Sequence, residues 1–326
     1  MTAYVLAHLS DPHLPPLPVA RVHELIGKRA LGYVNWRRNR HTIHRRELLD
    51  LLVADMQAQQ PDHIAITGDL VNLALPSEFA PARRWLESVG PPEHVTVIPG
   101  NHDAYVRGTR HRFAETFGDY LRGDDAGPAR AFSSEVGSGS REENASDSGD
   151  IDFPFVQRRG PLALIATSTA VPTAPFMATG RLGRAQLAAL DRVLAQLAQE
   201  SIQESIQEPA FRVLLIHHPL HPEHHGRFKR LTDAGALLAL IERHGVDLIL
   251  HGHDHVHSTM WFNGPRGRIP AIGVPSASAV AHGHHPPAAY NLFSILQDGA
   301  HWRCEQRVRG WIESKGVRDI RRVALI

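Results

Sequence analysis

Side chains that can bind a metal ion or move a proton follow directly after five short apolar segments of this chain. The densest set comes after Val95–Ile98, a run of β-branched residues that suits a buried strand and is ended by Pro99. Carboxylate, amide and imidazole groups together suit transition metals, and His is the commonest proton carrier near neutral pH. The five motifs are Asp11-Pro12-His13, Gly68-Asp69, Gly100-Asn101-His102-Asp103, His217-His218-Pro219 and Gly252-His253-Asp254-His255.

Each motif is predicted to lie at the C-terminal end of a strand, where polar side chains can converge without disturbing a core. Helices are predicted between the strands, with apolar residues at helical spacing in His44–Gln59, Ser77–Val89 and Ala234–His244. Ser77 is the expected N-cap, and Gly90 and Gly245 the helix ends. This alternation of strand and helix predicts parallel sheet. The strands are expected within Val5–Ser10, His63–Thr67, Val95–Ile98, Val213–Ile216 and Val246–Leu250.

The second half of the chain adds antiparallel strands to this pattern. Leu162–Ala166 is predicted to be a buried strand, followed by a helix with a stripe of Leu187, Leu190, Leu194 and Leu197. Tyr290–Gln297 and Ala300–Arg309 form a predicted hairpin around Asp298-Gly299. An α/β fold of two mixed sheets packed face to face, with helices outside both, accommodates all of these elements.

Composition limits the classes of protein to consider. A chain of 326 residues with 42% hydrophobic and 21% charged residues is typical of a globular enzyme, and we expect a single domain over residues 1–326. The net charge of +1 gives no general attraction to nucleic acid. The lone Cys304 excludes an internal disulfide, and no signal peptide or apolar membrane span is apparent, so we expect a cytoplasmic protein.

Three segments are expected outside the regular core: an insertion at about 21–46, a mobile loop at about 122–152 without chemistry, and a C-terminal hairpin extension at about 286–326. The insertion is basic and partly apolar, and three interpretations stay open: a solvated cap, a platform for an anionic substrate or for peripheral contact at the inner membrane face, and a nucleic-acid contact. Its basic residues are Arg21, Lys28, Arg29, Arg37, Arg38, Arg40, Arg45 and Arg46, among Leu25, Ile26, Leu31, Tyr33, Val34 and Trp36.

In order and spacing the five motifs resemble the five blocks of the calcineurin-like metallophosphoesterases, over roughly residues 4–275. The resemblance implies a four-layer αββα sandwich and a dinuclear metal centre. It also implies the ligands: Asp11, His13, Asp69 and His255 for one metal, and Asp69, Asn101, His217 and His253 for the other.

Inorganic chemistry agrees with these ligands. Two divalent ions about 3.5–4 Å apart need a bridging carboxylate, which Asp69 can supply. A mixed oxygen and imidazole set suits Mn, Fe, Zn or Co better than Mg or Ca. The expected reaction is in-line attack on phosphorus by a metal-bridging hydroxide. His102 is the expected general acid, and Asp103 is expected to orient it by a hydrogen bond.

Several residues keep alternative interpretations. His217 and His218 compete for one ligand position, and the resemblance favours His217. Ser276 is expected to be a loop residue, since a metal-activated water makes a protein nucleophile unnecessary. Asp254, His251 and His257 are expected to support the ligands or lie at the surface. His221, His224, His225, His282, His284 and His285 either line the substrate mouth or are simply exposed.

The predicted function is hydrolysis of a phosphodiester or pyrophosphate bond in a phosphorylated small molecule or lipid-linked substrate. The resemblance admits cyclic-nucleotide and glycerophosphodiester hydrolases, and also the UDP-2,3-diacylglucosamine pyrophosphohydrolases. The insertion favours a lipid-linked or bulky anionic substrate. Two further alternatives are a non-catalytic metal-binding scaffold and a nuclease. The nuclease is disfavoured by the near-neutral charge and the lack of an aromatic stacking groove.

Overall fold

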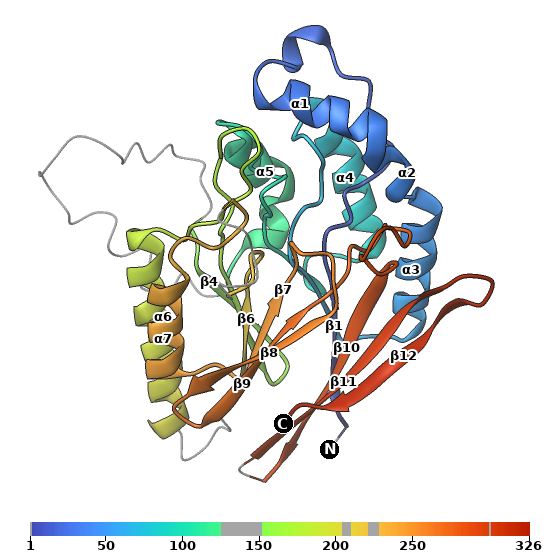
Figure 1. Ribbon diagram of the computed structural model, residues 1–326. Coiled ribbons are helices and arrows are strands. Elements are labelled where there is room, and N and C mark those ends of the chain that lie inside the picture. The colour runs from blue at the N-terminus through green and yellow to red at the C-terminus, as the bar shows by residue number, and fades with distance from the viewer. Residues whose placement is uncertain (1, 125–151, 204–209, 221–227, 300) are drawn as a thin grey trace, which may run out of the picture.

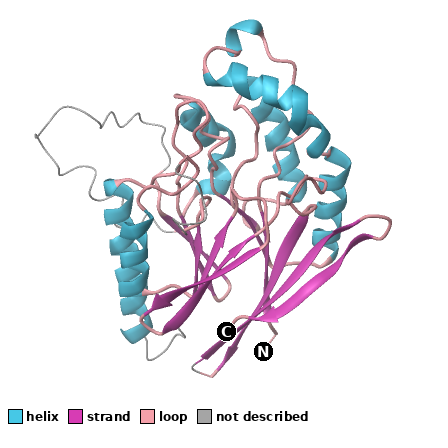
Figure 2. Cartoon of the chain, viewed as in Figure 1, coloured by secondary structure: helices cyan, strands magenta, loops and turns pink. Residues whose placement is uncertain are grey.

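Two six-stranded mixed sheets pack face to face and helices cover their outer faces, as a computed structural model shows (Figures 1 and 2). The structure describes residues 2–124, 152–203, 210–220, 228–299 and 301–326. The predicted architecture of two mixed sheets with helices outside is therefore confirmed. None of the helices in these ranges has the length and apolar character needed to cross a membrane.

The first sheet has the strand order β12-β11-β10-β1-β2-β3. Its parallel part consists of β1 (Tyr4–Leu9), β2 (His63–Ile66) and β3 (Val95–Val97). The antiparallel part consists of β10 (Ala289–Asp298), β11 (His301–Ile312) and β12 (Gly316–Ala324). The predicted hairpin is confirmed as β10 and β11. Asp298, which was expected in the turn, instead ends β10 and pairs with His301 at the start of β11. Strand β12 was not predicted.

The second sheet has the order β4-β5-β6-β7-β9-β8. Its inner strands are parallel: β5 (Leu162–Ala166), β6 (Phe211–Leu215), β7 (Leu248–His251) and β9 (Gly267–Gly273). The edge strands β4 (Phe155–Arg159) and β8 (Ser258–Gly264) are antiparallel to their neighbours.

Both faces of β5 are buried, and its side chains alternate between two cores. Leu162 and Leu164 belong to the core between the sheets, whereas Ala163 and Ile165 pack with α6 (Arg184–Gln203) and α7 (Ala234–His244). A strand buried on both faces has a continuous apolar sequence, which is why this segment was recognisable. Figure 1 shows α6 and α7 side by side outside the second sheet.

Three further helices lie with the first sheet: α3 (Arg46–Ala58), α4 (Pro76–Val89) and α5 (Thr109–Phe117), which is followed by the 3-10 turn η3 (Gly118–Leu121). Helix α4 begins at Pro76, so the predicted Ser77 N-cap is wrong. Proline suits a first helical position because it has no N–H to satisfy, and the Glu78 carboxylate accepts the free N–H of Leu75 instead. The end at Gly90 is confirmed.

The insertion folds as η1 (Val22–Glu24), α1 (Lys28–Asn35), a π-helical turn (Trp36–Arg40) and α2 (His41–Ile43). The helix predicted from His44 begins only at Arg46, because His44 has an extended backbone and pairs with Ala279. Most of the predicted loop at 122–152 lies outside the described residues, so its mobility stays a prediction. The single-domain division also stays a prediction.

The packing of α3 on the first sheet depends on a partly buried ion pair. Arg309 on β11 donates two hydrogen bonds of 2.7 Å to the carboxylate of Asp55 on α3, and the Tyr290 hydroxyl donates a third. Burial raises the pKa of Asp55, but these hydrogen bonds outweigh burial and lower it below its ordinary value of 3.8. A lowered native pKa stabilises the fold above 3.8, and this contribution is lost as the pH falls further.

We expect Arg309→Gln to reduce the free energy of unfolding by about 1.5–3 kcal/mol at pH 7, because Asp55 keeps its charge but loses two charge-assisted hydrogen bonds. The loss should shrink at low pH, where Asp55 is protonated. Urea unfolding at both pH values measures the effect. Arg303→Gln is the matched control, since its exposed pair with Asp298 should contribute about 0–1 kcal/mol. Equal losses for the two variants would contradict this role.

Candidate metal centre

The five motifs meet at one edge of the sandwich, where the parallel strands of both sheets end. In Figure 1 this edge lies below α1. Five of the seven predicted ligands have a left-handed backbone, with φ of 53° at Asp11, 38° at His13, 58° at Asp69, 72° at His253 and 57° at His255. Left-handed backbone is unfavourable for such residues and concentrates at functional sites. Each strand end therefore turns sharply to present its side chain.

Four ligand atoms gather around a first position. His255 Nε2 lies 3.2 Å from both Asp11 Oδ1 and His13 Nε2. His13 Nε2 lies 3.6 Å from Asp69 Oδ2 and 3.9 Å from Asp11 Oδ1. All four residues except His255 are buried. These are the residues expected to hold one metal.

A second group shares Asp69 with the first. The Asn101 side-chain oxygen lies 3.2 Å from His217 Nε2 and 2.9 Å from His253 Nδ1. His217 Nε2 in turn lies 3.5 Å from Asp69 Oδ2, the same oxygen that approaches His13. The structure thus brings all seven predicted ligands together, in the two sets expected, with Asp69 between them.

The hydrogen bonds around the two groups show that the candidate ligand atoms suit metal cations. Asp11 Oδ1 is buried and has no hydrogen-bond partner among the described residues. The far ring nitrogens of His217 and His253 donate to the backbone carbonyls of Thr67 and Lys229, at 2.6 and 3.0 Å. When each ring is neutral, that tautomer leaves the lone pair on the nitrogen that faces the other ligand atoms. Divalent cations would satisfy all of these acceptors.

The electrostatics of the metal-free chain lead to the same conclusion. Burial raises the pKa of Asp69, but the attraction of His217 and His102 outweighs burial and holds it well below its usual value. Burial lowers the pKa of His217, but Asp69 more than compensates and raises it to about 10. Without a cation, a proton on His217 therefore balances the buried carboxylate. Burial also lowers the pKa of His13 and His253, which suits neutral ligands.

His102 lies beside the metal ligands but is held by groups other than those predicted. Its backbone N–H donates to Asp69 Oδ1 at 2.7 Å, and its ring Nδ1 donates to the carbonyl of Asn72 at 2.5 Å. The ring stacks on Tyr105 with centroids 5.4 Å apart. Arg40 Nη1 lies 3.2 Å from its other nitrogen, Nε2.

Asp103 does not orient His102, so that expectation is wrong. The Asp103 carboxylate accepts the backbone N–H groups of Asp69, Val71 and Gly100, at 2.8 to 3.0 Å. Asp103 therefore holds in place the loop that carries Asp69, and Asn72 rather than Asp103 fixes the His102 ring.

Hydrogen-bond partners decide which of the two competing histidines can serve as a metal ligand. His218 uses Nδ1 with Thr169 Oγ1 at 2.7 Å and Nε2 with the carbonyl of Ala178 at 3.1 Å, which leaves His217 for the ligand group. Ser276 donates to the Asp11 carbonyl at 2.6 Å, a structural bond that agrees with its expected loop role. His282, His284 and His285 line the cleft, as one interpretation expected, whereas His221, His224 and His225 lie outside the described residues.

Two site residues from the insertion were missed by the sequence analysis. His44 lies 4.8 Å from His13 between ring centroids, and its Nδ1 contacts Ser278 Oγ at 2.8 Å. Arg40 approaches both His102 and His44. Trp36, which one open interpretation of the insertion placed at a membrane surface, is buried and stacks on His44. The spacing of four residues between Trp36, Arg40 and His44 was the available signal, since such residues share a helix face.

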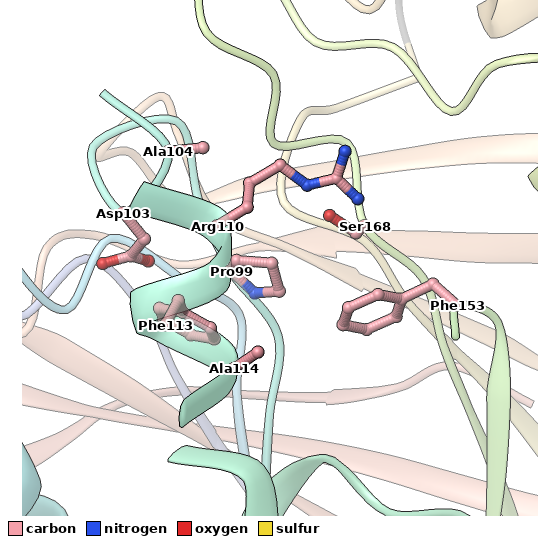
Figure 3. A pocket seen from close by; sticks show the side chains of 8 residues that line it. All are labelled: Pro99, Asp103, Ala104, Arg110, Phe113, Ala114, Phe153 and Ser168. Atoms are coloured by element: carbon pink, nitrogen blue, oxygen red, sulfur yellow. The ribbon is translucent and has the colours of Figure 1, made fainter. Parts of the chain in front are cut away.

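The site opens into a cleft of about 860 Å³ with polar and apolar walls, which is large enough for a nucleotide-sized group. A second hollow lies between α5 and the segments that carry Phe153 and Ser168 (Figure 3), and has a volume of only about 20 Å³. Its lining includes Phe113, Phe153 and Asp103, and none of the seven metal-ligand candidates. The smaller hollow can hold about one water molecule and is not a substrate site.

Comparison with known proteins assigns the family. A profile described as calcineurin-like phosphoesterase matches residues 4–257, so the chain belongs to that family. No curated protein sequence matches the chain. The resemblance inferred from the five motifs is thereby confirmed.

Several solved structures are similar to this chain but have little sequence in common with it. Purple acid phosphatase PPD1 from yellow lupin (Lupinus luteus) is 12% identical with a TM-score of 0.55, over 99% of this chain and 53% of that one. A putative 5'-nucleotidase from Staphylococcus aureus is 11% identical with a TM-score of 0.47, over 99% and 54%. Vps29 from Entamoeba histolytica, solved with Zn²⁺, is 12% identical with a TM-score of 0.36, over 98% of both chains. The chain thus spans about half the length of the first two.

We expect the purified protein to bind two divalent ions per chain and Asp69→Asn to weaken both sites by more than about 100-fold, since even an outer hydrogen-bond partner of a ligand contributes about 10–100-fold. Elemental analysis and Mn²⁺ titration calorimetry measure this. Asp191→Asn is the control, because Asp191 is partly exposed and pairs with His244 away from the site.

Calorimetry in two buffers should also detect proton release below about pH 10, because a cation must displace the proton held by His217. Affinity should therefore rise with pH across that range. At most one ion in the wild-type protein, or unchanged binding by Asp69→Asn, would contradict a shared carboxylate.

Proposed function

We propose that this protein is a metal-dependent hydrolase that cleaves a phosphodiester or pyrophosphate bond. The observation that carries the proposal is the pair of ligand sets joined by Asp69 Oδ2, with His102 directly beside them. Two cations bound there would supply Lewis-acid activation of water and neutralise phosphoryl oxygens. The mixed oxygen and imidazole donors favour Mn, Fe, Zn or Co.

The protein's own groups then have distinct tasks. His102 is the proposed general acid: Asn72 fixes the proton on Nδ1, so Nε2 is the atom that carries a proton to the leaving oxygen. Burial and Arg40 lower the pKa of His102 to about 4 in the metal-free chain, although Asp69 raises it. A phosphoryl oxygen that accepts the Arg40 N–H would release Nε2 to take up that proton. Arg40 is thus placed to hold the anionic group.

The complete ligand set argues against a non-catalytic scaffold. The size and mixed walls of the cleft favour a substrate with a large group on each side of the phosphorus over a small monoester. A lipid-linked pyrophosphate, such as a UDP-2,3-diacylglucosamine-like molecule, is the second candidate. The observation that favours it is the exposed apolar surface of the insertion. The insertion also contributes Asn35 and Ile43 to the lining of the cleft.

The test is an assay of the Mn²⁺-loaded protein against a cyclic nucleotide, a glycerophosphodiester, a nucleotide-lipid pyrophosphate, a phosphomonoester and single-stranded DNA. The proposal expects turnover of a diester or pyrophosphate, abolished by chelation and by Asp69→Asn. Preference for the monoester or for DNA would replace the proposed substrate class. No turnover by protein that holds two ions would favour the scaffold.

We expect His102→Ala to retain both metal ions and to slow turnover by about 10²–10⁴-fold, the usual contribution of a general acid. The defect should shrink for p-nitrophenyl esters, whose leaving group needs little protonation. Rate constants for good and poor leaving groups measure this dependence. Equal defects for both would contradict the role of His102.

Asp103→Asn is the informative comparison. Because its carboxylate holds three backbone N–H groups, we expect weaker metal binding and a free energy of unfolding lower by about 1–3 kcal/mol. The dependence on the leaving group should match that of the wild-type protein.

A further inference from the structure

The helical segment 28–43 has two faces with different surroundings. Its inner face packs on the site: Arg29 donates to the carbonyls of Leu73 and Ala74, Trp36 stacks on His44, and Arg40 reaches His102. Gly32 lies on the same face, and a Cβ there would collide with Tyr105 and Leu73. These contacts hold the segment rigidly against the site.

The outer face presents apolar and basic side chains to solvent. Leu31, Val34 and Arg38 follow one another at spacings of three and four residues, so they form one row along the helix, and Arg37 lies beside Val34. All four are exposed. Exposed apolar residues in a row with arginines are typical of helices that lie at a membrane surface.

The segment before the helix extends this surface. Val19 and Val22 are each 90% exposed and Ile26 is 75% exposed. Five of the twelve exposed large apolar residues in the described ranges lie between residues 19 and 34. Such a concentration on a soluble fold marks an interaction surface, because isolated exposed apolar residues would be scattered.

The charges around these apolar groups are almost all positive. Glu24 is the sole acidic residue between positions 12 and 46. Within the described residues Arg37 and Arg38 form no ion pair, whereas Arg46 is paired with Asp50. The partner that complements this surface therefore carries negative charge next to an apolar region.

We propose that this surface, made of Val19, Val22, Ile26, Leu31, Val34, Arg21, Arg37 and Arg38 and called the docking face below, binds the headgroup layer of an anionic lipid bilayer. The apolar side chains would enter the headgroup boundary and the arginines would contact the phosphates. Trp36, which the membrane-contact interpretation of the insertion included, is buried and takes no part.

The docking face borders the cleft, since the same helical segment contributes Asn35, Arg40 and Ile43 to the cleft wall. Figure 1 shows η1 and α1 together at the end of the molecule above the strand ends. If the proposed hydrolase activity holds, docking would bring the metal centre to phosphoryl groups at the bilayer surface. The binding itself requires no catalysis.

The experiment is sedimentation of the full-length protein with vesicles of phosphatidylglycerol and phosphatidylcholine, compared with vesicles of phosphatidylcholine alone, at low and high salt. We expect binding to the anionic vesicles that falls with salt. Arg37→Gln with Arg38→Gln should weaken it by about 25-fold, since each arginine near an anionic surface contributes about fivefold. Val19→Ser, Val22→Ser and Ile26→Ser together should weaken it by about tenfold or more.

The matched control is Ile320→Ser with Arg318→Gln, an exposed apolar residue and an exposed arginine on β12, which should bind like the wild-type protein. Metal content and hydrolysis of a small soluble diester should be unchanged in all of these variants, which separates this test from that of the proposed function. Absence of salt-sensitive binding by the wild-type protein, or equal loss in the control, would overturn the proposal. So would dimerisation through the docking face, detected by sedimentation velocity, with no vesicle binding.

Discussion

The buried negative charge of Asp69 is the constraint on which the site depends. One oxygen lies between His13, at the end of a strand in the first sheet, and His217, at the end of a strand in the second. The other accepts the backbone N–H of His102. A carboxylate so buried costs much free energy unless positive charge and hydrogen bonds surround it. The site supplies a proton on His217 in the metal-free chain, and divalent cations would take over that charge. The two sheets are therefore joined through this carboxylate as well as through their core.

The surroundings of the ligands are as specific as the ligands. Asp103 gathers three backbone N–H groups, so the loop with Asp69 and the turn at Gly100 keep one shape. Position 100 requires glycine, because a Cβ there would collide with the Asp69 carboxylate. Backbone carbonyls select the histidine tautomers. The left-handed backbone at five ligands is unfavourable locally, and this network of bonds is what maintains it.

The insertion connects the site to the molecular surface. The inner face of its helix delivers Arg40 and supports His44, while its outer face carries the exposed apolar and basic residues. Because the same rigid segment makes both sets of contacts, anything bound at the docking face lies at a fixed distance from the cleft. The position of the metal centre relative to a bound surface is thus set by helix geometry rather than by a flexible linker.

The sequence by itself indicated the strands that lead to the five motifs and the main helices, because apolar periodicity is a local signal, and the resemblance of those motifs to a known family implied the seven metal-ligand candidates. The edge strands β4, β8 and β12 were not predicted. Tertiary structure decided what depends on direction and distant partners. His218 is satisfied by Thr169 and Ala178, so His217 is the ligand candidate. Asp103 turns from His102 toward backbone N–H groups, and Trp36 turns inward onto His44. The partners of His218, and the Asp69 and Val71 N–H groups that Asp103 accepts, lie far away in the chain, so local spacing contains no information about which of two neighbouring side chains meets them.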